Sequence, residues 1–235
     1  MTKAPEWLFN ESDQVGVNYS NCALAEKYDS RHERFRDFHG EAGRIYKALN
    51  LSHDSIILDM GCGTGGISIH LARMCKHVYA VDISQAMIDI FRERLSQMGL
   101  NNTTTVCSGF LTYKHRGLRL DAVISNVALH HLPDFWKQVA LCRFYEMLKL
   151  GGKLFLSDVV YGFPPRDSLA SIETWLSSMK AMAGNAMTEE TIIHVREEYS
   201  TWNWILKGML ERAHFHIDSR VETMDQMFAY TCSKR

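Results

Sequence analysis

The stretch from Ser55 to Cys75, SIILDMGCGTGGISIHLARMC, limits the possible folds of this chain more than any other. It opens with a short apolar run, Ser55 to Leu58, whose β-branched residues are typical of a fully buried strand. Asp59 follows the run, and glycines come next at positions 61, 63, 65 and 66. The dense apolar pattern after them predicts a helix that is buried on more than one side. The unit is therefore a strand, a glycine-rich turn and a helix.

Glycines at this spacing allow a sharp backbone turn and let a ligand approach where a Cβ atom would block it. The N-terminus of the following helix leaves N–H groups without intrahelical partners near the same place. The turn therefore predicts a ligand site without identifying the ligand. Gly61, Gly63 and Gly66 also fit the G-x-G-x-x-G spacing of dinucleotide-binding enzymes, so a nicotinamide dehydrogenase is one alternative at this point.

The segment LDMGCGTG resembles the first motif of class I S-adenosylmethionine-dependent methyltransferases, in which apolar residues precede an acid, any residue and G-x-G-x-G. The resemblance implies that Asp59 lies under the methionine end of the ligand. It also implies that the backbone of Gly61, Gly63 and Gly65 passes beside the ribose and the amino-acid tail. An acid suits the ammonium and sulfonium cations of this ligand, whereas the pyrophosphate of a dinucleotide would favour bare N–H donors.

A second buried strand, His77 to Asp82 (HVYAVD), also ends in an acid. Asp82 lies 21 positions after Gly61, the distance at which a carboxylate can accept both ribose hydroxyls of an adenosine held on the glycine turn. Two independent signals therefore agree on an adenosine-containing ligand. Ile83 and Met87 resemble the residues that sandwich adenine in this family, although Met87 is equally compatible with a place in the core.

The third predicted strand, residues 103–108 (TTTVCS), departs from the family. At its end the family carries an acid that accepts the adenine amino group, whereas this chain has Ser108, Gly109 and Phe110. The adenine contact is therefore expected from a backbone group, from the serine hydroxyl, or from stacking on Phe110.

The fourth predicted strand, residues 121–126 (DAVISN), is followed by VALHHLPDFWKQV. Together they resemble the D-x-x-x-S-x-x-x-L-H-H-L pattern of the ubiquinone/menaquinone-biosynthesis type of methyltransferase. In those proteins the backbone around the positions of Ser125 and Asn126 faces the methyl-transfer site. This pattern is more specific than the glycine turn and favours a methyltransferase over a dehydrogenase.

His130 and His131 raise the question of a metal site or a general base. Adjacent residues on a helix point about 100° apart, so these two side chains are not expected to bind one ion. We therefore predict no metal site, with one histidine in a structural role near the helix start at Pro133. His130 is the candidate catalytic residue, because a histidine can take up a proton near neutral pH.

The last third of the predicted sheet begins with residues 153–160 (KLFLSDVV), the fifth strand. Its Asp158 is expected at the same rim as the acids of the first two strands, because parallel strands bring their carboxyl ends together. Residues 202–213 predict the last helix, and an antiparallel hairpin follows. His214 stands where the family has a glycine, and histidine tolerates the left-handed backbone that this turn requires.

Two further regions are predicted to close the site. Residues 1–50 resemble the helical cap of the family, with a helix over residues 22–38. Tyr28 in this cap is expected either to contact the cofactor carboxylate or to pack at the edge of the cap. Tyr19 and Tyr28 are, beside His130, the candidates for a base.

Residues 163–198 predict a lid insertion with two helical segments. The first runs from Asp167 to about Ala183, and the second begins at an N-cap, Thr188. Methionine and aromatic residues are frequent in this insertion, as a lid over an apolar acceptor requires.

Composition excludes several classes of protein. The 235 residues are 46% hydrophobic and 23% charged, which is ordinary for one globular core. The formal net charge of −1 gives no bulk attraction to nucleic acid or anionic lipid. Six cysteines without C-x-x-C spacing indicate buried thiols in a reducing compartment. No apolar run is long enough for a membrane span or a signal peptide, so a cytoplasmic location is expected.

These patterns predict one methyltransferase domain over residues 1–235. The expected fold is α/β, with a seven-stranded, Rossmann-like doubly wound sheet of order 3-2-1-4-5-7-6, its last strand antiparallel, and a helical cap and lid. S-adenosyl-L-methionine is the expected cofactor and a small molecule the expected methyl acceptor. A non-catalytic S-adenosylmethionine-binding protein and a tRNA-modifying relative remain alternatives, and a homodimer is left open.

Overall fold

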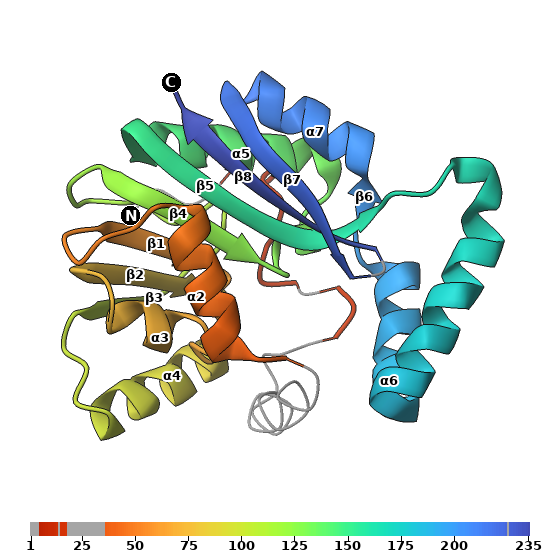
Figure 1. The fold of residues 1–235 in the computed structure, drawn as a ribbon, viewed down its shortest axis with the longest axis horizontal. Coiled ribbons are helices and arrows are strands. Elements are labelled where there is room, and N and C mark those ends of the chain that lie inside the picture. The colour runs from red at the N-terminus through yellow and green to blue at the C-terminus, as the bar shows by residue number, and fades with distance from the viewer. Residues whose placement is uncertain (1–4, 14, 18–35, 225) are drawn as a thin grey trace.

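The structure, a computed structural model, describes residues 5–13, 15–17, 36–224 and 226–235 (Figure 1). A largely parallel sheet crosses these residues in the order β3-β2-β1-β4-β5-β8-β7. Its strands are β1 (Ile56–Met60), β2 (His77–Asp82), β3 (Thr103–Cys107), β4 (Leu120–Asn126), β5 (Leu148–Tyr161), β7 (Phe215–Met224) and β8 (Met227–Lys234). A two-residue strand, β6 (Thr201–Trp202), pairs with β5 outside this order.

The predicted topology is confirmed. Counted along the chain without β6, the seven long strands have the order 3-2-1-4-5-7-6. β8 runs antiparallel to β5, and β7 runs antiparallel to β8. The short β6 is an addition that the sequence did not predict.

Helices cover both faces of the sheet (Figure 1). They are α2 (Phe38–Ala48), α3 (Ser68–Ala72), α4 (Gln85–Gln97), α5 (Asp134–Met147), α6 (Ser168–Glu197) and α7 (Asn203–Arg212). Successive residues of a strand point to opposite faces, so the fully buried Ile57 packs in the core with α2, α3 and α4, and its neighbour Leu58 packs in the core with α5 and α7. Both faces of the central strands are therefore buried, which explains their continuous apolar runs.

In the last third of the sheet, the start of β5 differs from the prediction, and the conformation of His214 agrees with it. β5 starts at Leu148, earlier than the predicted residue 153, because Leu148 already pairs with Leu120 of β4. His214 follows α7 with a φ of 67°, the left-handed conformation expected of it.

The predicted lid forms α6, which stands apart from the sheet in Figure 1. Gly184, with φ 82° and ψ −177°, interrupts the helix and divides it into two segments. The expectation that the second segment begins at Thr188 is wrong. Thr188 Oγ1 donates a hydrogen bond to the carbonyl of Gly184 at 3.0 Å, so Thr188 lies inside the second segment and does not cap it.

Most of the predicted cap helix, residues 22–38, lies outside the described residues, as do Tyr19 and Tyr28. Within the described part of the chain, no helix combines the length and the apolar character that a membrane crossing needs.

Candidate functional site

A cleft lies at the carboxyl ends of β1, β2 and β4, beside the point where the strand order reverses. It is lined by residues predicted to bind the cofactor: Asp59, Gly61, Gly63, Asp82, Ile83, Met87, Gly109, Phe110 and Asn126. Gly65 does not line it. The sequence motifs therefore converge in space as the parallel sheet requires.

Asp82 holds the end of β2 against the glycine turn. Its Oδ2 accepts a hydrogen bond from the Gly63 N–H at 2.8 Å, and its Oδ1 accepts one from the Ser84 N–H at 2.9 Å. Burial raises the pKa of Asp82, although the Ser84 and Gly63 N–H groups oppose that shift. The carboxylate is thus fixed in place, with lone pairs left for hydroxyl donors in the cleft.

Asp59 lies deeper in the same cleft and is 3% exposed. Its Oδ2 accepts a hydrogen bond from Ser68 Oγ at 2.6 Å. Burial raises the pKa of Asp59 to about 6, despite this hydrogen bond. A carboxylate with so little solvation gains from a cation bound beside it.

The glycine turn uses its glycines in different ways. Gly61 has a φ of 81°, and a Cβ atom there would lie 2.3 Å from the Cβ atom of Ala128. Gly65 has a φ of 82°, and a Cβ atom there would lie 2.2 Å from the ring of Phe91. Because that ring is fully buried, the missing side chain of Gly65 allows α4 to pack against the turn, and contact of Gly65 with the cofactor stays a prediction.

Glu11 was not predicted, and it lies at the end of β3, where the family acid is missing. The Leu111 N–H donates to Glu11 Oε1 at 3.0 Å, while Glu11 Oε2 is buried without a hydrogen-bond partner in the part of the chain that the structure describes. A Cβ atom at Gly109 would lie 2.4 Å from the Glu11 carboxyl carbon, so only glycine leaves room for this contact. Burial raises the pKa of Glu11.

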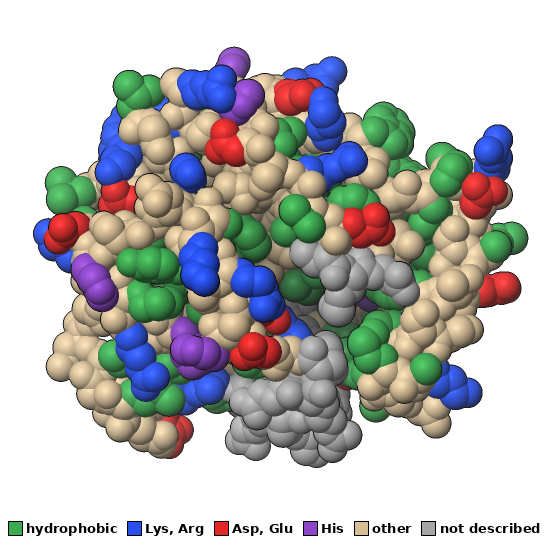
Figure 2. Space-filling model, viewed as in Figure 1, with side chains coloured by type: hydrophobic (Ala, Val, Ile, Leu, Met, Phe, Trp, Pro, Cys, Tyr) green, Lys and Arg blue, Asp and Glu red, His purple; other side chains and the backbone are tan. Residues whose placement is uncertain are grey.

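A second, larger cavity of about 940 Å³ lies between the sheet and α6. This volume is within the range of about 300–1,000 Å³ that small-molecule sites occupy. From α6 it is lined by Trp175, Met179, Met182 and Met187, and Figure 2 shows hydrophobic side chains on the inner side of this arm. Such an apolar and adaptable lining suits an acceptor with apolar parts.

The cleft and the larger cavity meet after β4, where Arg36, Asn126, Val127 and His131 line both of them. Val127 has a φ of 55°, which is unfavourable for a β-branched residue. Its N–H donates to the Ser157 carbonyl at 2.7 Å, which holds this strained turn against β5. Strain of this kind is concentrated at functional sites, and here it lies at the junction.

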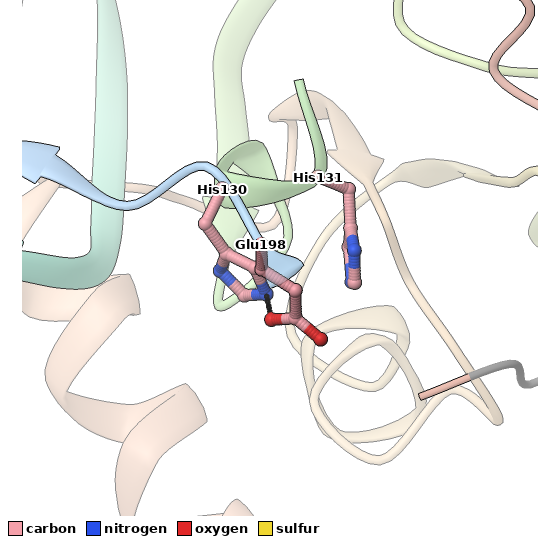
Figure 3. A group of neighbouring side chains, drawn as sticks. All are labelled: His130, His131 and Glu198. Carbon is pink, nitrogen blue, oxygen red and sulfur yellow. Dashed lines mark ion pairs between the residues drawn. The ribbon is translucent and has the colours of Figure 1, made fainter. Parts of the chain in front are cut away.

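His130 lies in the short 3-10 turn Leu129–His131 after β4, with its ring between the carboxylates of Asp158 and Glu198. Figure 3 shows the ring beside Glu198. Its Nδ1 is 2.5 Å from Asp158 Oδ1, and its Nε2 is 3.2 Å from Glu198 Oε2. Burial disfavours the charged ring, but Asp158 and then Glu198 outweigh burial and raise the pKa of His130. The structure thus places Asp158 beneath this turn, where its Oδ2 also accepts the His130 N–H at 3.0 Å.

Glu198 and His194, at the end of α6, complete this cluster, and sequence reasoning missed both. Glu198 Oε2 pairs with His194 Nδ1, and His194 Nε2 is 2.8 Å from Ser200 Oγ. Burial would raise the pKa of Glu198, but His194 and His130 lower it to about 2.

The expectation that His130 and His131 point apart is wrong. They lie in a 3-10 turn rather than an α-helix, and their ring centroids are 4.4 Å apart. His131 Nδ1 is buried and has no hydrogen-bond partner among the described residues. Burial, followed by the charge of His130, lowers the pKa of His131 to about 4, so this ring is neutral at neutral pH.

Comparison with known proteins agrees with this geometry. Residues 57–152 match a family model described as a methyltransferase domain. An uncharacterized methyltransferase of Schizosaccharomyces pombe is 32% identical over 114 residues, which are 45% of this chain and 39% of that protein. The chain spans between 39% and 64% of the length of the first curated relatives it matches.

Solved structures share the fold. A SAM-dependent methyltransferase from Aquifex aeolicus has a TM-score of 0.64 at 19% identity, covering 92% of this chain and 99% of that one. The [4+2]-cyclase SpnF has a TM-score of 0.66 at 13% identity, covering 94% of this chain and 98% of that one. The fold by itself therefore does not fix the reaction.

None of these relatives carries the name of the ubiquinone/menaquinone-biosynthesis type, and that finer resemblance stays a prediction. The order of the motifs and the sheet topology agree with the methyltransferase domain matched over residues 57–152 and with the methyltransferase relatives, so this chain has the fold of the S-adenosylmethionine-dependent methyltransferases.

Proposed function

We propose that this chain transfers the methyl group of S-adenosylmethionine to a small molecule held in the larger cavity. The observation that carries the proposal is the junction of the two cavities at Asn126, Val127 and His131, with the buried acids of β1 and β2 on the cofactor side. A methyl group that projects from the cleft at this junction meets an acceptor in the larger cavity. The buried carboxyl of Asp59, whose pKa burial raises, suits a cationic ligand better than the pyrophosphate of a dinucleotide.

In this proposal Asp59 faces the cationic methionine end and Asp82 accepts the ribose hydroxyls, while Ile83 and Met87 contact the adenine. An acceptor lone pair forms the bond to the methyl carbon as the C–S bond breaks and its electron pair returns to sulfur. The acceptor proton leaves to solvent or to a basic group. The protein contributes in-line placement and exclusion of water, because the sulfonium is already a good leaving group.

His130, the catalytic residue predicted from the sequence, lines the larger cavity but not the cofactor cleft. Both of its ring nitrogens face carboxylates, so in the absence of other ligands it is a poor base. A role for His130 on the acceptor side remains a proposal, and positioning of the acceptor fits its geometry better than proton abstraction.

Glu11 is the proposed acceptor for the adenine amino group, because its Oε2 is buried, unpaired and beside the cleft. A hydrogen bond to a charged group contributes about 1.5–3 kcal/mol, so Glu11→Ala should weaken S-adenosylhomocysteine binding by about 10- to 100-fold. The analogue of S-adenosylhomocysteine with a 6-oxo group in place of the amino group cannot donate this hydrogen bond. Glu11→Ala should therefore bind that analogue no more weakly than the wild type does. Glu6→Ala, an exposed acid of the same segment, is the matched control. Equal losses for both ligands would contradict the assignment.

The pH dependence of cofactor binding tests the role of Asp59. Its raised pKa of about 6 means that the free protein takes up a proton there as the pH falls below 6. A cationic ligand prefers the carboxylate, so the affinity for S-adenosylmethionine should fall by up to about tenfold per pH unit below that value. Calorimetric titration between pH 7.5 and 5 measures this. Asp59→Asn should bind weakly and without the pH dependence, and a flat profile for the wild type would exclude Asp59 from the cation site.

A further inference from the structure

We propose that His130, His131 and Glu198 form a binding site for a divalent transition-metal cation, with Zn²⁺ as the best-suited ion. One ring nitrogen of each histidine and a carboxylate oxygen of Glu198 all lie within 4.8 Å of one another (Figure 3). His130 Nε2 and Glu198 Oε2 are 3.2 Å apart. Two ligands bound tetrahedrally at the usual Zn²⁺ distances are separated by about 3.4 Å, so these atoms already have the spacing that a shared ion requires.

The residues around the site hold the ligands in the orientation that metal binding needs. Asp158 Oδ1 accepts from His130 Nδ1, so loss of the Nε2 proton on metal binding would leave the Nε2 lone pair directed toward the space beside Glu198. His194 Nδ1 pairs with the same oxygen, Glu198 Oε2, and helps to hold that carboxylate in place. A carboxylate behind a ligating histidine is the arrangement that sets the tautomer and orientation of the ring in metal sites.

His131 supplies a second, independent observation. Its Nδ1 is buried, and no donor or acceptor among the described residues meets it. Buried polar atoms are nearly always paired in folded proteins, so an unpaired imidazole nitrogen beside a histidine and a carboxylate points to a missing ligand. A metal ion would take the place of the partner that this ring lacks.

The chemistry of the donors selects the ion. Two imidazole nitrogens and one carboxylate suit Zn²⁺ and related transition metals, with His130 giving up its proton as the ion binds, whereas Ca²⁺ and Mg²⁺ prefer oxygen ligands. Three protein ligands leave at least one coordination position for a further molecule. All three residues line the larger cavity, and His131 also lines the cofactor cleft, so that position faces the acceptor.

The consequence for substrate class rests on the proposed methyl transfer. An acceptor with a thiol or hydroxyl group would bind the cation through that group and release its proton to solvent. The anion then attacks the methyl carbon, and the C–S electron pair returns to sulfur. The cluster would thus favour acceptors whose nucleophilic atom binds Zn²⁺ over amines that are protonated at neutral pH.

Zinc titration of the full chain tests the site. Protein freed of metal with a chelator is titrated with Zn²⁺ in competition with a chromophoric chelator, and with Co²⁺ to record its visible spectrum. The wild type should bind one equivalent and give the strong absorption of low-coordinate Co²⁺. His131→Ala and Glu198→Gln should each weaken binding at least about 100-fold, which exceeds the usual effect of losing a group that only orients a ligand.

His70→Ala is the matched control, because it removes the half-buried member of a second histidine pair, His39 and His70, whose ring nitrogens are 3.4 Å apart. This control should bind Zn²⁺ like the wild type. Absence of Zn²⁺ binding by folded wild type, or unchanged binding by either ligand variant, would overturn the site. The wild-type stoichiometry and Co²⁺ spectrum decide the question even if a variant fails to fold.

A parallel titration of the metal-free protein with S-adenosylhomocysteine separates this inference from the proposed function. Cofactor binding without Zn²⁺ binding would overturn the metal site and leave the methyltransferase proposal standing. Zn²⁺ binding without cofactor binding would support the metal site and overturn the methyltransferase proposal.

Discussion

Asp158→Ala is expected to lower the free energy of unfolding of the metal-free protein by about 3–5 kcal/mol, the usual effect of removing one partner from a buried ion pair. Asp158 is 3% exposed and accepts hydrogen bonds from His130 Nδ1, from the His130 N–H and from the Val159 N–H. The substitution leaves these donors unpaired in the interior. Urea unfolding followed by circular dichroism measures the change.

The effect of Asp158→Ala should depend on pH. His130 has a raised pKa, so the stability it contributes is complete below its unfolded value of about 6.5 and is lost as the pH rises through the folded value. Asp158 has a lowered pKa, so its contribution is present above about 3.9. The loss should therefore be largest between about pH 4 and 6.5. Asp89→Ala, at an exposed acid paired with Arg92, should change stability by less than about 0.5 kcal/mol. A similar loss in both variants would contradict the buried pair.

Gly65→Ala is expected to lower the free energy of unfolding by about 2–5 kcal/mol. A left-handed backbone costs an alanine about 1–2 kcal/mol, and inserting a methyl group into a packed core costs about 1–3 kcal/mol more. Both apply, because Gly65 has a φ of 82° and its Cβ atom would lie 2.2 Å from the buried Phe91 ring. The shift of the urea midpoint at constant slope measures the loss.

Gly43→Ala is the control for Gly65→Ala. Gly43 lies within α2, and a Cβ atom there would meet no atom within 4 Å. Alanine is the better helix former by up to about 1 kcal/mol, so this variant should be as stable as the wild type or more stable. Equal stability of the two variants would show that the turn does not hold Gly65 in the described conformation.

The sequence predicted the sheet well because its signals are local. The apolar run, the acid and the glycines of β1 and its turn are contiguous, and each glycine constrains its own backbone. The same holds for the left-handed His214, which one residue and its neighbours determine. Tertiary packing does not change the local structure that such short-range patterns determine. The order of the strands then follows from the rules for connections between parallel strands.

Residues brought together by packing could not be found in this way. Glu11 meets Leu111 across 100 positions, and no periodicity links the two segments. His130 and Asp158 are 28 positions apart, and their contact depends on β5 lying beside β4. The expectation for His130 and His131 assumed α-helical geometry, whereas the actual 3-10 turn brings the two rings together. The sequence also gives no signal for Glu198, because its contact with His130 depends on how α6 packs beside the sheet.

The cleft between Asp59 and Asp82 is the proposed binding site for S-adenosylmethionine. Calorimetric titration of the wild type and of Asp82→Ala with S-adenosylmethionine and S-adenosylhomocysteine tests it most directly, with Asp89→Ala as the exposed-acid control. The wild type and the control should bind both ligands with micromolar affinity. Asp82→Ala should bind them at least about tenfold more weakly, as expected for the loss of one charged hydrogen-bonding partner. Failure of the folded wild type to bind either ligand would show that this cleft is not a cofactor site.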